Sequence, residues 1–184
     1  MATHTHKTLK EKQKDAAKIF ATEFGYKNAM QAPKILKAVV AAGVGSFKDK
    51  KKIELAADRL GKITGQKAVL RGAKKSIASY KTRVGDPVGY QVTLRGDKMW
   101  QFLEKLVHIA LPRTKDFRGL SRSAADGIGG YTIGIKEHSI FPEASDEELK
   151  DVFGLAVTIV TNVKKKNETI RFLDALGFPV QKEK

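Results

Sequence analysis

The hydrophobic positions of this chain switch between the spacing of an α-helix and the alternation of a β-strand, which predicts an α+β fold. Apolar residues recur at helical spacing in four segments, residues 7–24, 50–64, 97–111 and 167–176. Shorter apolar or alternating runs predict strands at residues 35–42, 66–71, 90–95, 131–136 and 155–163. We expect the strands to form one sheet with a solvent-exposed face and a buried face that the helices cover.

Polar residues and proline mark the ends of these elements. Asp49, Asp97 and Asn167 stand where helix N-caps are expected, because a short side-chain oxygen can accept a hydrogen bond from the first backbone N–H groups of a helix. Pro112 ends the third predicted helix. Residues 72–89 hold several glycines within a basic run, which indicates a long exposed loop or a hairpin.

Length and composition indicate one main domain. We predict a basic helical arm over residues 1–30 and a single domain over residues 31–180. The chain has no cysteine, which excludes disulfides and thiolate metal sites. It has no apolar run near the length of a membrane span, about 20 residues, and its first 14 residues lack the apolar stretch of a secretory signal. We expect a soluble, cytoplasmic protein with no membrane partner.

The charge of the chain is large and unevenly distributed. It carries 35 Lys and Arg against 20 Asp and Glu, a net charge of +15. Residues 1–66 hold 14 basic and 6 acidic residues, residues 67–122 hold 13 and 4, and residues 123–184 hold 8 and 10. A basic surface concentrates polyanions and releases their counterions. We therefore favour a nucleic acid as the partner over a basic surface that serves only solubility.

The densest basic segment lies within residues 67–83, where no acidic residue occurs and Tyr80 lies among the cations. Small residues keep this segment slim, so it can enter an RNA groove or lie along phosphates. The alternative is a flexible, solvated loop, which the absence of acidic residues disfavours. The basic residues of the segment are Lys67, Arg71, Lys74, Lys75, Lys81 and Arg83.

Alternation along residues 90–95 predicts a strand with one apolar and one polar side. The polar side would stand beside Lys67 and Arg71 if this strand pairs with the predicted strand at 66–71. Such a surface suits the backbone and 2′-hydroxyls of RNA, and an ordinary solvated sheet face is the alternative. The polar side consists of Gln91, Thr93 and Arg95.

A second basic patch follows Pro112. Arginine can pair with a phosphate in bidentate fashion or stack on a base, and Phe117 could stack beside it or belong to the core. The basic residues of this patch are Arg113, Lys115, Arg118 and Arg122. The chain also has an acidic segment, which could face solvent or contact a basic protein. Its members are Glu143, Asp146, Glu147, Glu148 and Asp151.

Positive signs of an enzyme are missing from the sequence. Gly43-Val44-Gly45 lies between a strand and a helix, but Lys48 occupies the place of the third glycine of a dinucleotide loop, so a tight turn is the better interpretation. The four histidines have neither metal-site nor triad spacing. A nuclease would need clustered carboxylates or a cofactor loop, and a membrane-surface protein would need a basic amphipathic helix, for which residues 7–24 are the sole candidate. We expect no catalysis, no cofactor and no metal.

From about Gln31 to Pro179 the chain resembles the family of the universal large-subunit ribosomal protein number five, in its bacterial form. No single short match is specific, whereas the ordered set is. The first matching stretches are Pro33-Lys34-Ile35, Gly43-Val44-Gly45, Ile63-Thr64-Gly65-Gln66-Lys67, Ala73-Lys74-Lys75-Ser76-Ile77-Ala78 and Val92-Thr93-Leu94-Arg95-Gly96. The later ones are Ala110-Leu111-Pro112-Arg113, Asp116-Phe117-Arg118-Gly119-Leu120-Ser121, Tyr131-Thr132-Ile133-Gly134-Ile135-Lys136-Glu137, Ile140-Phe141-Pro142-Glu143 and Leu176-Gly177-Phe178-Pro179.

This resemblance implies a concave, mainly antiparallel sheet with helices packed on one face. It also implies a structural protein that seats 5S ribosomal RNA in the central protuberance, with other 5S-associated proteins as neighbours. Gln66 and Thr93 match family contacts to that RNA. Where the family usually has Asn-Met before Gly-Val-Gly, this chain has Ala41-Ala42, so one amide contact to RNA is missing or replaced.

The resemblance further implies contacts outside 5S RNA. The stretch matching Ala73–Arg83 approaches the transfer RNA in the peptidyl site and nearby 23S ribosomal RNA. The stretch around Phe141–Asp151 matches the contact with small-subunit head protein thirteen, a basic protein, in an intersubunit bridge. That contact would explain the acidity of this segment.

Overall fold

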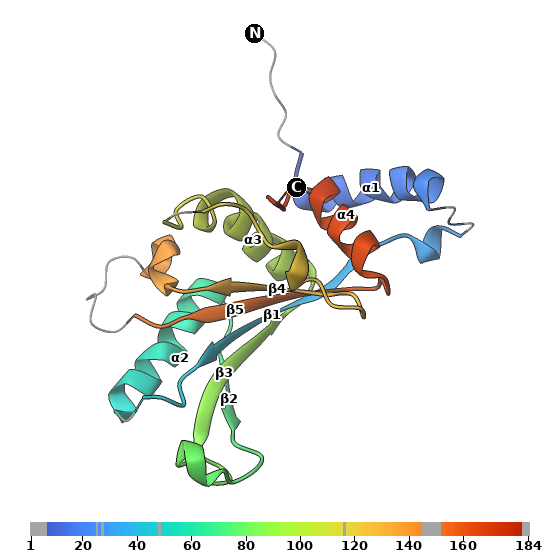
Figure 1. Ribbon diagram of the computed structural model, residues 1–184. Helices are drawn as coiled ribbons and strands as arrows, with labels where there is room; N and C mark the ends of the chain where they lie inside the picture. Colours follow the sequence, from blue (N-terminus) through green and yellow to red (C-terminus); the bar gives the residue numbers. More distant parts are fainter. Residues whose placement is uncertain are drawn as a thin grey trace. The chain divides into compact units, whose positions relative to one another are not determined.

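The computed structural model describes residues 7–24, 26, 28–47, 49–115, 117–144 and 152–181, and these contain four α-helices and an open five-stranded sheet (Figure 1). The helices are α1 (Leu9–Glu23), α2 (Lys50–Thr64), α3 (Gly96–Lys105) and α4 (Lys166–Leu176). The strands are β1 (Ile35–Gly43), β2 (Val69–Gly72), β3 (Pro87–Leu94), β4 (Gly130–Ile135) and β5 (Leu155–Thr161). The predicted α+β class with a mainly antiparallel sheet is confirmed.

The described residues divide into two compact units. The sheet unit consists of Ala38–Leu94 and Ile133–Thr158, and it contains most of the sheet together with α2. The helical unit consists of the residues up to Lys37, Arg95–Thr132, and those from Ile159 onward, and it contains α1, α3 and α4. The strand order of the sheet is β2-β3-β1-β5-β4.

The two faces of the sheet unit differ as the alternating sequence predicts. β1 and β3 are antiparallel, with Val40 opposite Val92 and Ala41 opposite Gln91. Val40 and Val92 are buried, whereas Ala41 and Gln91 are half-buried on the other face, which we call the open face. α2 contacts β3 within this unit. The helix residues that are buried there are Ala56, Arg59, Leu60, Ile63 and Thr64.

Burial of apolar side chains on the covered face is the main stabilising term of this unit. Leu60 has no exposed surface, and burying a side chain of this size contributes about 1.5–3 kcal/mol. α2 begins where the sequence predicts, because the Asp49 side chain accepts a hydrogen bond of 3.0 Å from the Lys51 N–H. It ends at Gly65, which has a φ of 65° that a glycine adopts without strain.

Two of the predicted helix caps are wrong. α3 begins at Gly96 with Arg95 as N-cap, so Asp97 lies in the first turn, where its carboxylate accepts a hydrogen bond of 2.9 Å from Lys10 Nζ. α4 begins at Lys166, one residue before Asn167, and its N-cap makes no side-chain bond. A carboxylate in the first turn still interacts favourably with the helix dipole, which explains why Asp97 suits this place without being the cap.

Two element ends also differ from the sequence pattern. α3 does not run to residue 111 as a regular α-helix, because Leu106–Ala110 are π-helical and the Leu111 N–H donates to the Leu106 carbonyl. β2 begins at Val69 rather than at Gln66. The residues before it follow the left-handed Gly65, and the Thr64 hydroxyl donates to the Gln66 carbonyl at 3.2 Å.

In the helical unit, α1 packs against α4 through aromatic side chains. The Phe20 ring meets the Phe172 ring edge-on at 6.1 Å and stacks on Phe24 at 5.2 Å between centroids. The Tyr26 hydroxyl donates to Glu168 at 3.0 Å. Burial, and then that carboxylate, raise the pKa of Tyr26 to about 12. Thr8 begins α1 with a capping box.

Candidate nucleic-acid interface

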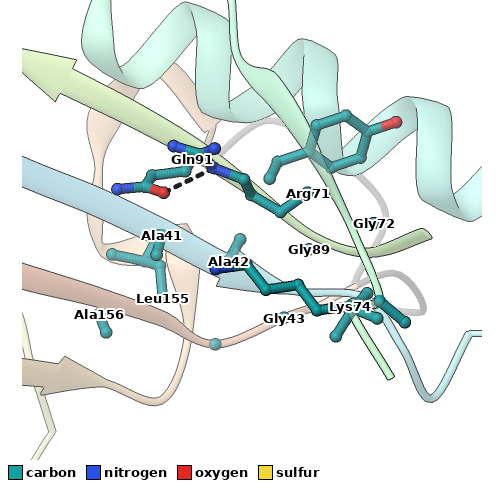
Figure 2. A pocket seen from close by; sticks show the side chains of 14 residues that line it. Ala41, Ala42, Gly43, Arg71, Gly72, Lys74, Gly89, Gln91, Leu155 and Ala156 are labelled. Carbon is teal, nitrogen blue, oxygen red and sulfur yellow. Dashed lines mark hydrogen bonds between the residues drawn. The ribbon is translucent and has the colours of Figure 1, made fainter. Parts of the chain in front are cut away.

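The open face carries the polar side of β3, and β2 pairs with β3 as the sequence interpretation required. Val69 lies opposite Gln91 and Arg71 opposite Gly89 in this antiparallel pair. Arg71 and Gln91 therefore stand on the same face of neighbouring strands. Arg71 Nε donates a hydrogen bond of 2.8 Å to Gln91 Oε1, so the guanidinium fixes which way the Gln91 amide points (Figure 2).

Gln66 and Thr93 are brought together at the same edge of the sheet unit. Gln66 Nε2 donates to the Thr93 carbonyl at 3.4 Å, a long hydrogen bond. Gln66 is exposed and Thr93 is half-buried on the open face. The Gln66 side chain thus lies next to the Thr93 backbone, although the two residues are far apart in the sequence. Lys67 and Arg95 next to them in the chain are exposed as well.

The loop between β2 and β3, residues 73–86, which we call the basic loop, extends the β2–β3 hairpin and is held by its own backbone hydrogen bonds. Its base is closed by two backbone hydrogen bonds, Ala73 N–H to the Asp86 carbonyl at 2.9 Å and Gly85 N–H to the Ala73 carbonyl at 3.0 Å. Ile77 and Thr82 form a bridge nearer the tip. Backbone pairing at two levels argues against the alternative of a featureless solvated loop.

The tip of the basic loop presents an aromatic ring among cations. Tyr80 is 77% exposed, and Lys81 has a φ of 53°, in the left-handed region where a non-glycine residue is uncommon. The predicted basic residues on this loop are all exposed, namely Lys74, Lys75, Lys81 and Arg83. An exposed ring with cations around it suits contact with bases and phosphates.

Between the basic loop and the open face lies a hollow of about 650 Å³. Arg71 and Gln91 lie together on one side of it and Lys74 on another (Figure 2). The hollow is lined by Ala41, Ala42, Gly43, Arg71, Gly72, Ala73, Lys74, Val88, Gly89, Tyr90, Gln91, Gly154, Leu155 and Ala156. The sequence interpretation missed this hollow, because strands β1, β3 and β5 contribute to it from distant parts of the chain.

The second basic patch belongs to the helical unit. Arg113, Lys115 and Arg118 are exposed, and Arg122 is partly buried. Phe117 is half-buried, so the alternatives of stacking and core packing both stay open for it. The Arg118 carbonyl accepts a hydrogen bond from Gln181 Nε2 at 3.3 Å, which helps to hold the backbone of this patch.

The acidic segment is described only in part. Glu143 is exposed within a short 3-10 turn, Pro142–Ala144. The predicted protein-contact residues Asp146, Glu147 and Glu148 lie outside the described residues.

His138 is a buried residue of the sheet unit, in agreement with a structural role. Its ring stacks on Phe153 at 4.2 Å between centroids, and the Phe153 N–H donates to Nδ1 at 3.2 Å. Nε2 lies 3.2 Å from Nη1 of the buried Arg59. Burial, and then the Arg59 charge, lower the pKa of His138 from its usual value. No sequence pattern indicated this pair, because the two residues are far apart along the chain.

Carboxylates in the described part of the chain do not converge on a metal site. No group of three or more His, Asp or Glu residues there could hold an ion. Asp126 instead accepts backbone hydrogen bonds from Ile128 at 3.0 Å and Gly130 at 2.6 Å, which fixes a turn. None of the helices described is both long enough and apolar enough to cross a membrane.

Two family models match consecutive parts of the chain. The model described as Ribosomal protein L5 matches residues 28–83, and the model that describes the C-terminus of the same ribosomal family matches residues 87–180. The chain is 48% identical over 168 residues to the Large ribosomal subunit protein uL5 of Trichlorobacter lovleyi, with 91% of this chain and 94% of the relative covered. It is 47% identical over 171 residues to the protein of the same name from Mycoplasma pneumoniae, with 92% and 95% covered.

Proposed function

Because this chain belongs to the ribosomal protein L5 family, we propose that it binds 5S ribosomal RNA and helps to attach it in the central protuberance. Membership of this family makes the chain a structural constituent of the large ribosomal subunit, with ribosomal RNA and other ribosomal proteins as its partners. It also means that the chain is not an enzyme and that it works in the ribosome, in the cytoplasm.

The observation that carries this proposal is that Gln66 and Thr93 are neighbours in the folded chain. The family resemblance singles out these two residues, and the folded chain places the Gln66 amide within 3.4 Å of the Thr93 backbone. Side-chain amides and hydroxyls give direction to an RNA contact, whereas Lys and Arg supply most of the affinity through phosphates. Arg71 and Arg95 provide such cations on β2 and just beyond β3.

Gln91 replaces the amide that position 41 lacks in this chain. Ala41 faces Gln91 directly in the β1–β3 register. A cross-strand neighbour can deliver a hydrogen-bonding group to nearly the same point above the sheet. The hydrogen bond from Arg71 holds the Gln91 amide in place for that contact.

The basic loop serves a second RNA contact. As the family resemblance implies, Lys74, Lys75, Lys81 and Arg83 approach the transfer RNA in the peptidyl site and nearby 23S ribosomal RNA. Their exposure on a paired hairpin between β2 and β3 supports this contact. Lys67, Arg113 and Arg118 add phosphate contacts. The acidic segment that includes Glu143, Asp146, Glu147 and Glu148 contacts small-subunit protein thirteen across the subunit interface.

The proposal is tested with the variant Gln66→Ala plus Thr93→Ala. We expect its affinity for a 5S ribosomal RNA transcript to fall at least tenfold, since two directional contacts at about 1 kcal/mol or more each are removed. Filter binding measures the affinity, and circular dichroism checks that the fold is kept. Gln101→Ala, an exposed amide deletion on α3, is the matched control. Full affinity in the double variant would contradict the assignment of these residues.

A further inference from the structure

The side chains of Arg71, Gln91 and Lys74 give the hollow beside the open face an edge rich in hydrogen-bond donors. Gln91 Oε1 already accepts a bond from Arg71 Nε. The Arg71 Nη atoms, the Gln91 Nε2 amide and the Lys74 ammonium at this edge are all donors. None of the 14 residues that line the hollow is acidic. The occupant that fits this edge is therefore rich in acceptors and negatively charged.

The floor of the hollow, which the strand residues form, is apolar and consists mostly of small side chains. Ala41, Gly89 and Ala156 come from three adjacent strands, β1, β3 and β5 respectively. Gly89 cannot be replaced without movement, since a Cβ there would lie 2.8 Å from the Ala42 carbonyl oxygen. An apolar floor of small side chains offers van der Waals contact to the face of a planar ring.

The size of the hollow is that of a small-ligand site. Its volume of about 650 Å³ falls within the range of small-ligand sites, about 300–1,000 Å³. Arg71 and Lys74 are the cations among the residues that line it. A base can lie on the floor while its ribose and phosphate stay in solvent near the Lys74 ammonium.

We propose that this hollow receives a single guanine nucleotide of the RNA bound on the open face. Guanine presents two acceptors, O6 and N7, on one edge, and Arg is the side chain that most often pairs with them. Adenine would turn its N6 amino donor toward the donors of Arg71 and Gln91. The inference rests on the proposed RNA-binding function and adds a base-specific contact to it.

The first test asks whether Arg71 contacts N7 of a guanine. A 5S ribosomal RNA transcript made with 7-deazaguanosine lacks the N7 acceptor at every guanine. The affinities of this transcript and of the normal transcript are compared for the wild type, for Arg71→Ala and for Lys164→Ala. Lys164 is an exposed residue of the helical unit and serves as the control. We expect the deaza substitution to weaken wild-type and Lys164→Ala binding about tenfold more than it weakens Arg71→Ala binding.

The second test fills the hollow without changing charge. Ala41→Leu places a larger apolar side chain on the floor, whereas Val160→Leu adds a methylene on β5 outside the hollow. We expect Ala41→Leu to weaken RNA binding about tenfold and to abolish the extra loss of affinity that the 7-deaza transcript shows with the wild type. Val160→Leu should bind both transcripts as the wild type does. Circular dichroism verifies the fold of each variant, and the Arg71→Ala comparison stands on its own if Ala41→Leu fails to fold.

The outcomes separate this inference from the function on which it rests. A wild type that does not bind the normal transcript overturns both. Two results, with a wild type that binds the normal transcript, overturn the guanine site alone. One is that the 7-deaza transcript loses as much affinity for Arg71→Ala as for the wild type. The other is that Ala41→Leu folds and binds with full affinity. The guanine site is supported if the extra loss of affinity for the 7-deaza transcript disappears in Arg71→Ala and persists in Lys164→Ala.

Discussion

Removing the four cations of the basic loop should change how its RNA binding depends on salt. The perturbation is the variant with Lys74, Lys75, Lys81 and Arg83 all replaced by Ala. All four side chains are exposed, and the loop backbone is held by its own hydrogen bonds near Ala73, Ile77 and Gly85. The variant should therefore fold, and the change in binding should come from charge.

The magnitude follows from counterion release. Each phosphate that a cation neutralises contributes about 0.7–0.9 to the slope of log K against log salt concentration. If all four cations of the loop meet phosphates, the slope becomes shallower by about 3. The Asp86 carboxylate, which accepts the Arg83 backbone N–H at 2.6 Å, is kept in the variant and so does not enter this difference.

The assay is filter binding of transfer RNA and of a 23S ribosomal RNA fragment at several salt concentrations. The matched control replaces four exposed lysines elsewhere, Lys50, Lys51, Lys164 and Lys166, and so removes the same charge. We expect the loop variant alone to lose slope. An unchanged slope, or an equal loss in both variants, would refute the assignment of a phosphate contact to this loop.

Three further predictions concern the scaffold. Because the pKa of His138 is lowered in the folded chain, the unfolded chain binds the proton first, so the stability of the fold should fall as the pH drops below about 6.5. Thermal unfolding at pH 7.5 and 5.5 should show a smaller fall in stability for His138→Asn than for the wild type. An equal fall would exclude this residue as the cause. Gly129→Ala should destabilise the fold by at least about 1–3 kcal/mol, because the φ of Gly129 is 91° and a Cβ there would lie 2.0 Å from the Val163 carbonyl oxygen. Urea unfolding measures this loss. The control is Gly127→Ala, because a Cβ at Gly127 meets nothing within 4 Å. Phe20→Ala should lower the free energy of unfolding by about 3–5 kcal/mol and Ile19→Ala by little, since the two side chains are 2% and 58% exposed. A negligible effect of Phe20→Ala in urea unfolding would show that α1 does not pack stably in the helical unit.

Local pattern and total charge were enough to predict several features of this protein. The alternation of residues 90–95 predicted which side of β3 is buried, because successive side chains of any strand point to opposite faces. Asp49 was correctly predicted as a cap, since its side chain needs only the next turn of backbone. The excess of Lys and Arg predicted a polyanionic partner, because charge acts at long range and does not require exact placement.

Which polar groups meet became known only from the folded chain. The Arg71–Gln91 hydrogen bond depends on the β2–β3 register, which shifts between Arg71 and Gly72. The Arg59–His138 contact and the hollow join segments far apart in the chain. The caps predicted at Asp97 and Asn167 were wrong because each residue lies in the first turn of its helix, two positions after the residue at the N-cap. Contacts between distant residues depend on the relative placement of whole elements, which no local pattern encodes.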